Sequence, residues 1–207
     1  MIASLRKTYR RLRYGEPIVV VSGLPRSGTS MAMKMLEAGG LDVVVDGLRT
    51  ADEDNPKGYY EDERVKDLAN ELDKSWLTEA RGKVIKVISF LLKELPETQN
   101  YQIIFMRRDL REVLASQAKM LERRGESSET DDERMLELWG DHLWKVDRLL
   151  RRAPHFEAIE IQYRDAIENP RQMAVQMRNF LDLDLDLDQM TGVVDEKLYR
   201  NRAPETG

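Results

Sequence analysis

The chain has 207 residues, of which 41% are hydrophobic and 34% are charged, with a formal net charge of −5 and no cysteine. This balance predicts one soluble cytoplasmic globular domain and argues against general nucleic-acid binding. The lack of cysteine excludes disulfides, thiolate zinc sites and cysteine nucleophiles, and no apolar run approaches the roughly 20 residues of a membrane-spanning helix.

Residues 1–14 carry five basic residues and no acidic one, and Ile2, Leu5, Tyr9 and Leu12 recur at helical spacing. We expect a basic amphipathic helix, followed by a single domain over residues 15–207. Two interpretations of the helix compete. It either contacts a membrane surface or another anionic partner, or it docks on the domain with its basic face in water. The second is favoured because the segment is short.

The apolar run over residues 17–22 leads into the turn Gly23-Leu24-Pro25-Arg26-Ser27-Gly28-Thr29-Ser30. A buried strand, a glycine-bracketed turn and a following helix together form a phosphate-binding arrangement, because backbone N–H groups and the helix dipole both favour an anion there. The spacing is that of a P-loop, but Thr29 stands where the lysine is expected and Arg26 is the basic residue. The alternative is a tight strand–helix turn without a ligand.

The remaining elements alternate between strands and helices. We expect strands at residues 41–45, 84–88, 101–106 and 156–163, and helices at 29–38, 61–80, 109–124, 135–150 and 169–181. The last helix should start with Asn169 as its cap and Pro170 in its first turn, and residues 181–188 should end it and begin another turn. This order predicts an α/β fold, a P-loop NTPase-like three-layer sandwich with a central parallel sheet and helices on both faces.

A second anion site is predicted where Arg108 follows a strand and Ser116 lies about two turns into the next helix. Both side chains fall near one face, so they could hold a second phosphate. The alternative is an arginine that pairs with Asp109, which also begins a capping box with Glu112, beside an ordinary helical serine.

Taken together, these motifs resemble those of the sulfotransferases. Residues 25–30 resemble the loop that holds the 5′-phosphosulfate of 3′-phosphoadenosine 5′-phosphosulfate (PAPS), and the spacing of Arg108 and Ser116 matches the grip on its 3′-phosphate. Residues 163–170 resemble the family's Tyr-Glu-Asp-x-x-x-x-Pro segment, in which the tyrosine lies near the adenine. The three motifs occur in the family's order over residues 17–181.

The resemblance implies PAPS as co-substrate, no metal, and roles for further residues. Arg26 would stabilise the leaving phosphate oxygen, with Lys86 as a second cation. Ile88 stands where cytosolic members have a catalytic histidine, so Glu61 is the candidate base, unless it only caps a helix. His142 and His155 are expected to be structural. Arg200 and Arg202 are candidates for closing over the nucleotide, unless they belong to a frayed tail.

The predicted function is transfer of a sulfuryl group from PAPS to a hydroxyl or amine acceptor, which is a small molecule, glycan or lipid. One alternative is a small-molecule or nucleotide kinase, which needs the lysine that Thr29 replaces. The other is a non-catalytic nucleotide-binding protein of the same fold. The sequences of the loops over residues 47–60 and 122–133 do not indicate which acceptor is bound.

Overall fold

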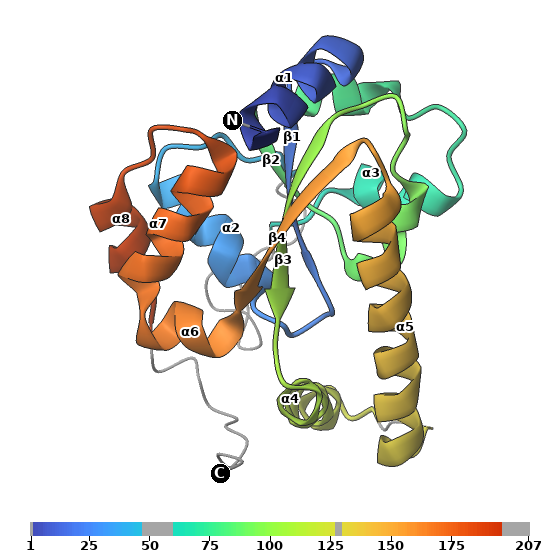
Figure 1. Ribbon diagram of the computed structural model, residues 1–207. Coiled ribbons are helices and arrows are strands. Elements are labelled where there is room, and N and C mark those ends of the chain that lie inside the picture. The colour runs from blue at the N-terminus through green and yellow to red at the C-terminus, as the bar shows by residue number, and fades with distance from the viewer. Residues whose placement is uncertain (1, 47–59, 127–129, 196–207) are drawn as a thin grey trace.

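A computed structural model describes residues 2–46, 60–126 and 130–195 (Figure 1). Its centre is a parallel sheet in which the strands stand in the order β2-β1-β3-β4. These strands are β1 (Ile18–Gly23), β2 (Val84–Lys86), β3 (Tyr101–Arg107) and β4 (Phe156–Gln162). The inner strand β1 is buried along its whole length, as expected for a sheet covered on both faces.

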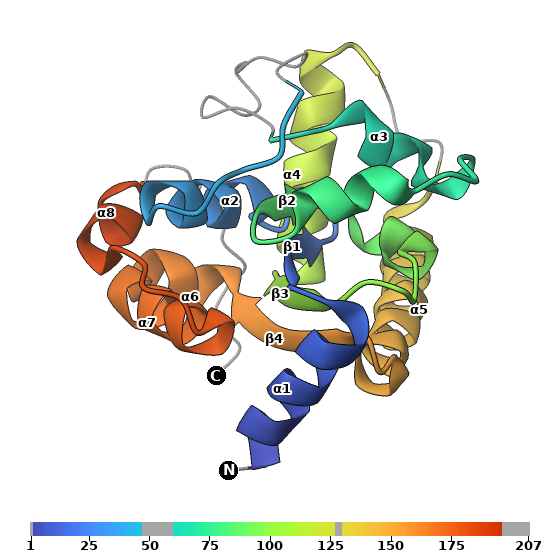
Figure 2. The ribbon, with the colours of Figure 1, turned by 90° about the horizontal axis from the view of Figure 1, so that it is seen from above.

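Helices cover both faces of the sheet (Figure 2). One face packs against α2 (Thr29–Ala38), α7 (Pro170–Leu181) and α8 (Leu187–Gly192) in a methionine-rich core. The other face packs against α5 (Asp132–Arg152) and a set of short helices: α3 (Glu63–Lys66), η1 (Asp67–Ala69), η2 (Ser75–Ala80) and η3 (Ser89–Glu94). The predicted three-layer α/β sandwich is confirmed.

Two further helices start near the carboxyl ends of strands. Helix α4 (Leu110–Arg123) follows β3, and α6 (Tyr163–Glu168) follows β4 directly (Figure 1). Together with the turn after β1, they bring the three sequence motifs to one end of the sheet. This is the end at which parallel α/β sheets bind ligands.

Helix α1 (Ile2–Tyr14) lies at the opposite end of the sheet, near the amino ends of the strands (Figure 1). It contacts the domain through basic residues: Lys7 Nζ donates to the Phe180 carbonyl over 2.7 Å, and Arg10 pairs with Glu157. Leu5, Tyr9 and Leu12 are exposed instead. The favoured interpretation, a docked helix with its basic face in water, is therefore wrong about which face is docked.

Two predicted elements differ in the structure. The expected strand at 41–45 forms only an isolated bridge between Val43 and Val84. The expected helix at 61–80 is split into α3, η1 and η2, because the polar stretch between them turns the chain outward and leaves Leu72 fully exposed. Side-chain hydrogen bonds such as that from Ser75 N to Asp73 compete there with helix continuation.

The later helices follow the prediction with small changes. Pro170 lies in the first turn of α7 as expected, but the side chain of Asn169 makes no capping hydrogen bond. Residues 181–188 do end α7 and begin α8. The longest described helix, α5, is amphipathic, and no helix among the described segments is both long and apolar enough to cross a bilayer.

Candidate functional site

The turn after β1 is built from residues with left-handed backbone conformations. Gly23, Arg26 and Gly28 have φ values of 153°, 69° and 99°. The turn closes with a hydrogen bond from Ser27 N to the Leu24 carbonyl, over 3.1 Å. A non-glycine residue in this region costs about 1–2 kcal/mol, so the conformation of Arg26 is held by its surroundings. Such strain is concentrated at functional sites.

Both glycines of the turn are required by close contacts. A Cβ at Gly28 would lie 2.4 Å from Tyr163 Cδ2, and one at Gly23 would lie 2.7 Å from the Met106 carbonyl. The ring of Tyr163 therefore packs directly on the second glycine of the turn. The Ser27 hydroxyl is buried and has no hydrogen-bond partner in the structure, so a polar atom of the turn is left for a ligand to satisfy.

Helix α2 begins at the turn without a side-chain cap. Its N-cap is Gly28, whose carbonyl accepts from Met31 and Ala32, and no side chain bonds to the N–H groups of its first turn from this position. The start of a helix carries the positive end of the helix dipole, and its first backbone N–H groups have no carbonyl partner within the helix. The turn is therefore shaped for an anion.

Arg108 reaches the turn from the end of β3. Its Nη1 donates to the Arg26 carbonyl over 3.1 Å, and its guanidinium lies 4.4 Å from the centre of the Tyr163 ring. The side chain is only 6% exposed. Arg108 thus joins the turn, the strand end and Tyr163 in one cluster, and it faces the loop rather than solvent.

A buried carboxylate balances this arginine. Glu112 Oε2 accepts from Arg108 Nε over 3.0 Å, while its Oε1 lies 3.7 Å from Arg164 Nη2. Sequence analysis treated Glu112 as half of a capping box. Asp109 does cap α4, accepting from the backbone N–H groups of Arg111 and Glu112, and the Glu112 side chain in addition pairs with Arg108. The four-residue spacing of Arg108 and Glu112 in the sequence could have indicated this pair, because such residues lie on one side of a helix.

Ser116 is paired with Arg26. Its hydroxyl accepts from Arg26 Nε over 3.1 Å, and the residue is 6% exposed. Sequence analysis placed Ser116 with Arg108 at a phosphate site separate from the loop. The structure brings Arg26, Arg108 and Ser116 together, because Arg108 donates to the Arg26 carbonyl and the side chain of Arg26 reaches Ser116 on α4.

Lys86 and Glu61 form a second charged group beside the turn. Lys86 is paired in register with Val21 of β1, and its Nζ lies 3.5 Å from Glu61 Oε1. Glu61 Oε2 is 3.4 Å from Lys66 Nζ. The backbone carbonyl of Glu61 accepts from Asp46 N over 3.2 Å, which fixes the main chain at this position. Glu61 does not cap the following helix: Asp62 does, through a hydrogen bond from Arg64 N.

The two histidines lie outside these groups. His142 Nε2 is 2.9 Å from the Ser89 hydroxyl and its ring stacks on Phe90, while His155 packs against Tyr101 and Phe156. Burial lowers the pKa of both, so the neutral imidazoles are favoured. Sequence analysis missed the pairing of His142 with Ser89, which depends on segments far apart in the chain.

Some predicted site residues cannot be placed. Arg200, Arg202 and the residues 55–59 that precede Glu61 lie outside the described residues. Thr29 and Ser30 begin α2 and are partly buried, whereas Pro25 is exposed at the surface of the turn.

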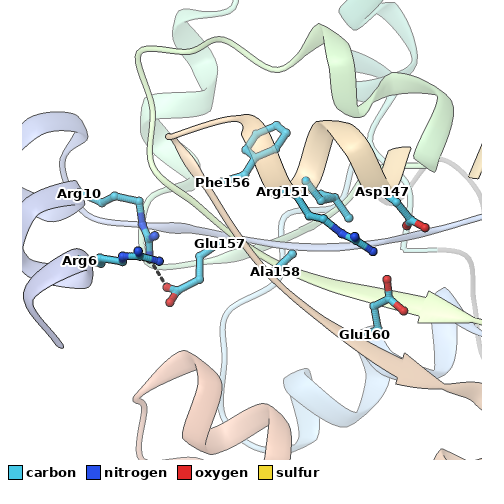
Figure 3. A pocket seen from close by; sticks show the side chains of 9 residues that line it. Arg6, Arg10, Asp147, Arg151, Phe156, Glu157, Ala158 and Glu160 are labelled. Atoms are coloured by element: carbon cyan, nitrogen blue, oxygen red, sulfur yellow. Dashed lines mark hydrogen bonds and ion pairs between the residues drawn. The ribbon is translucent and has the colours of Figure 1, made fainter. Parts of the chain in front are cut away.

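A cavity of about 630 Å³ lies elsewhere, between α1, α5 and the start of β4 (Figure 3). Its charges are largely balanced, because Glu157 pairs with Arg10 while Asp147 and Glu160 pair with Arg107. Residues at the amino end of β4 line this cavity, whereas the glycine turn follows the carboxyl end of β1. We assign this cavity no part in binding at the turn.

The fold and the turn define a P-loop-like α/β protein whose glycine-bracketed turn carries Thr29 in place of the usual lysine. A model of the sulfotransferase family matches residues 65–187, more than half of the chain. The chain therefore belongs to the sulfotransferase family. The matched region contains Lys86, Arg108, Ser116 and Tyr163, and it begins after the glycine turn.

Solved structures share the fold over almost the whole chain. Mouse sulfotransferase SULT7A1, complexed with PAP, is 14% identical, with 90% of this chain and 68% of that chain covered at a TM-score of 0.55. Sulfotransferase STF1 from Mycobacterium tuberculosis H37Rv is also 14% identical, with 93% and 76% covered at a TM-score of 0.53. No curated protein sequence matches this chain.

Proposed function

We propose that this protein transfers a sulfuryl group from PAPS to a hydroxyl or amine acceptor, with residues 25–30 holding the 5′-phosphosulfate and Arg108 and Ser116 holding the 3′-phosphate. The observation that carries the proposal is the hydrogen bond of 3.1 Å from Arg108 to the Arg26 carbonyl. It supports a single anion-binding surface made by the turn and the end of β3. Family membership supports the same reaction.

The residues fit the demands of sulfuryl transfer. The acceptor oxygen or nitrogen forms a new bond to sulfur while the bond between sulfur and the 5′-phosphate oxygen breaks, and that oxygen keeps the electron pair. Arg26 and the N–H groups at the start of α2 would stabilise the charge on this leaving oxygen; removing one such donor costs about 100- to 1,000-fold in rate. Arginine stays protonated, so Arg26 acts by charge alone.

Glu61 and Lys86 would serve the acceptor side. A carboxylate within 3.5 Å of the Lys86 ammonium places a proton acceptor and a cation side by side next to the turn. Glu61 would take the proton that the acceptor loses, and Lys86 would orient Glu61 and add positive charge. Tyr163 would fix the positions of Gly28 and Arg108 through its ring. Arg200 and Arg202 remain candidates for closing over the nucleotide.

A kinase is not favoured. Kinases of this fold neutralise the transferring phosphoryl group with a loop lysine and Mg²⁺, and Thr29 takes the place of that lysine here. A sulfuryl group carries less negative charge, which is why the predicted reaction needs no metal. The acceptor is a small molecule, glycan or lipid, and the protein does not need nucleic acid for this activity.

Calorimetry with 3′-phosphoadenosine 5′-phosphate, the desulfated product, tests the proposal. Removing Arg108 alone would leave the buried Glu112 without its nearest cation, with Arg164 at 3.7 Å, so the variant to use is Arg108→Met/Glu112→Leu, which replaces the pair by apolar groups. Arg107→Gln is the matched control, since Arg107 pairs with Asp147 and Glu160 instead. We expect wild type and control to bind alike and the double variant to lose affinity at least tenfold.

Two results would contradict the proposal. Failure of the wild type to bind the nucleotide at about millimolar concentration would exclude a PAPS-dependent enzyme, and binding of MgATP in its place would favour the kinase. Unchanged affinity of a folded double variant would remove Arg108 from the site. Turnover of labelled PAPS with a panel of hydroxyl acceptors separates an enzyme from a non-catalytic nucleotide-binding protein.

A further inference from the structure

Helix α1 presents an apolar face to solvent. Leu5, Tyr9 and Leu12 are 65%, 57% and 84% exposed. Their spacing of four and three residues, at about 100° per residue, places them within about 60° of one another on the helix. Large apolar side chains that gather on one exposed face, rather than occurring singly, mark an interaction surface.

The opposite face of α1 attaches it to the domain. Lys7 donates to the Phe180 carbonyl over 2.7 Å, and Arg10, which is 9% exposed, pairs with Glu157. Figure 2 shows α1 projecting beyond β4 at the edge of the sheet, with its first residues outermost. The apolar stripe therefore points away from the protein. Its side chains are more than half exposed, so no described residue of the chain covers them.

Positive charge borders the stripe. By the same helical spacing, Arg13 and the exposed Arg6 lie on one side of it, with Arg6 also at the edge of the cavity that Arg10 lines, and Arg11, which pairs with Glu16, lies further away on the other. Residues 1–14 carry five positive charges and no negative one, and the whole chain carries −5, so residues 15–207 carry −10. An anionic surface would therefore attract this helix and repel the rest of the protein.

We propose that α1 binds anionic membrane surfaces, with Leu5, Tyr9 and Leu12 buried at the boundary between headgroups and acyl chains and the bordering arginines on lipid headgroups. An exposed apolar stripe between arginines is the pattern of helices that lie in the plane of a membrane. A second copy of this chain is the other candidate occupant. It is disfavoured because two such helices, face to face, would bring the exposed arginines of both copies together.

This attachment leaves the proposed active site free. Helix α1 lies at the amino ends of the strands, while the glycine turn and α4 lie at the carboxyl ends (Figure 1). A protein attached through α1 thus keeps its nucleotide loop on the side away from the lipid. Membrane binding and nucleotide binding are predicted to be independent, so each can fail without the other.

Sedimentation with lipid vesicles tests the proposal on the full chain. Vesicles of phosphatidylcholine with about 30% phosphatidylserine are compared with pure phosphatidylcholine vesicles, at low and at high salt. The apolar variant is Leu5→Ser/Leu12→Ser, and its matched control is Leu72→Ser, which changes a fully exposed leucine remote from α1. The charge variant is Arg6→Gln/Arg13→Gln, with Arg134→Gln, another exposed arginine, as control.

We expect binding to the anionic vesicles only, weakened by salt. Each arginine near the surface contributes roughly fivefold, so the charge variant should bind at least tenfold more weakly. Loss of two leucine side chains should weaken binding at least tenfold, and both controls should match the wild type. Melting temperature and nucleotide affinity should be the same in all five proteins.

The proposal is overturned if the wild type does not sediment with anionic vesicles, or if the apolar variant binds as well as Leu72→Ser. It is also overturned if light scattering finds a wild-type dimer that Leu5→Ser/Leu12→Ser converts to a monomer, because the stripe would then be an interface between copies.

Discussion

The contact between Gly28 and Tyr163 can be tested by adding one methyl group. In Gly28→Ala, the new Cβ would lie 2.4 Å from Tyr163 Cδ2 and 2.9 Å from its Cε2, at a backbone φ of 99°. Two costs therefore add. The left-handed backbone costs about 1–2 kcal/mol, and forcing a methyl group against a packed ring costs about 1–3 kcal/mol.

Gly40 provides a closely matched control. Its φ is 98°, almost the same as that of Gly28, but a Cβ there would have nothing within 4 Å. Gly40→Ala should therefore cost only the backbone term. The difference between the two variants isolates the contact with Tyr163, which we expect to be about 1–3 kcal/mol.

Urea denaturation of both variants measures these free energies of unfolding, and calorimetry measures their affinity for 3′-phosphoadenosine 5′-phosphate. We expect Gly28→Ala to lose about 2–5 kcal/mol of stability and at least tenfold in affinity, because the ring must move and with it Arg108, which stacks on it. Gly40→Ala should bind the nucleotide with the affinity of the wild type. Equal losses of stability in the two variants would refute the reasoning, since the ring contact would then cost nothing.

Three further predictions concern the charged groups. Glu112→Gln should destabilise the protein by about 3 kcal/mol in urea melts, because the buried guanidinium of Arg108 loses its carboxylate partner. A loss below about 1 kcal/mol would contradict this, since it is the value of an ion pair whose charges are solvated. Glu61→Gln should lower kcat roughly 100-fold and leave the nucleotide affinity unchanged. The control is Glu63→Gln, which removes another partner of Lys66 and should leave kcat unchanged. Equal kcat values in the two variants would exclude Glu61 as the base. Burial lowers the pKa of His155 from its ordinary value of 6.5, so the unfolded chain takes up a proton at a higher pH than the folded protein does. The stability that the neutral His155 contributes is therefore complete above pH 6.5 and is lost as the pH falls below it. His155→Phe should flatten the decline of melting temperature between about pH 7 and pH 5.5, and an unchanged slope would contradict this.

Much of the sheet and the conformation of the glycine-bracketed turn could be predicted because their signals are local. The run of β-branched residues in β1 and the two glycines of the turn specify a buried strand and a left-handed turn, whatever surrounds them. The helix at 61–80 failed because its apolar spacing is interrupted around Leu72, where polar side chains bond the backbone locally.

The partners of the charged residues could not be predicted, because they depend on the assembled fold. Arg26 meets Ser116 across 90 residues of sequence, and Arg10 meets Glu157 across 147. The amphipathic pattern of α1 was recognised, but a pattern alone does not say which face finds a partner. In the structure, the face that carries Lys7 and Arg10 meets the domain, while Arg6, Arg11 and Arg13 stay exposed.

A structure of the protein in complex with 3′-phosphoadenosine 5′-phosphate tests the central claim most directly. The account predicts the 5′-phosphate against the backbone of residues 25–30 and the 3′-phosphate against Arg108 and Ser116, with one nucleotide spanning both. A nucleotide bound elsewhere, such as in the cavity between α1 and α5, or with its 3′-phosphate away from Arg108, would contradict it.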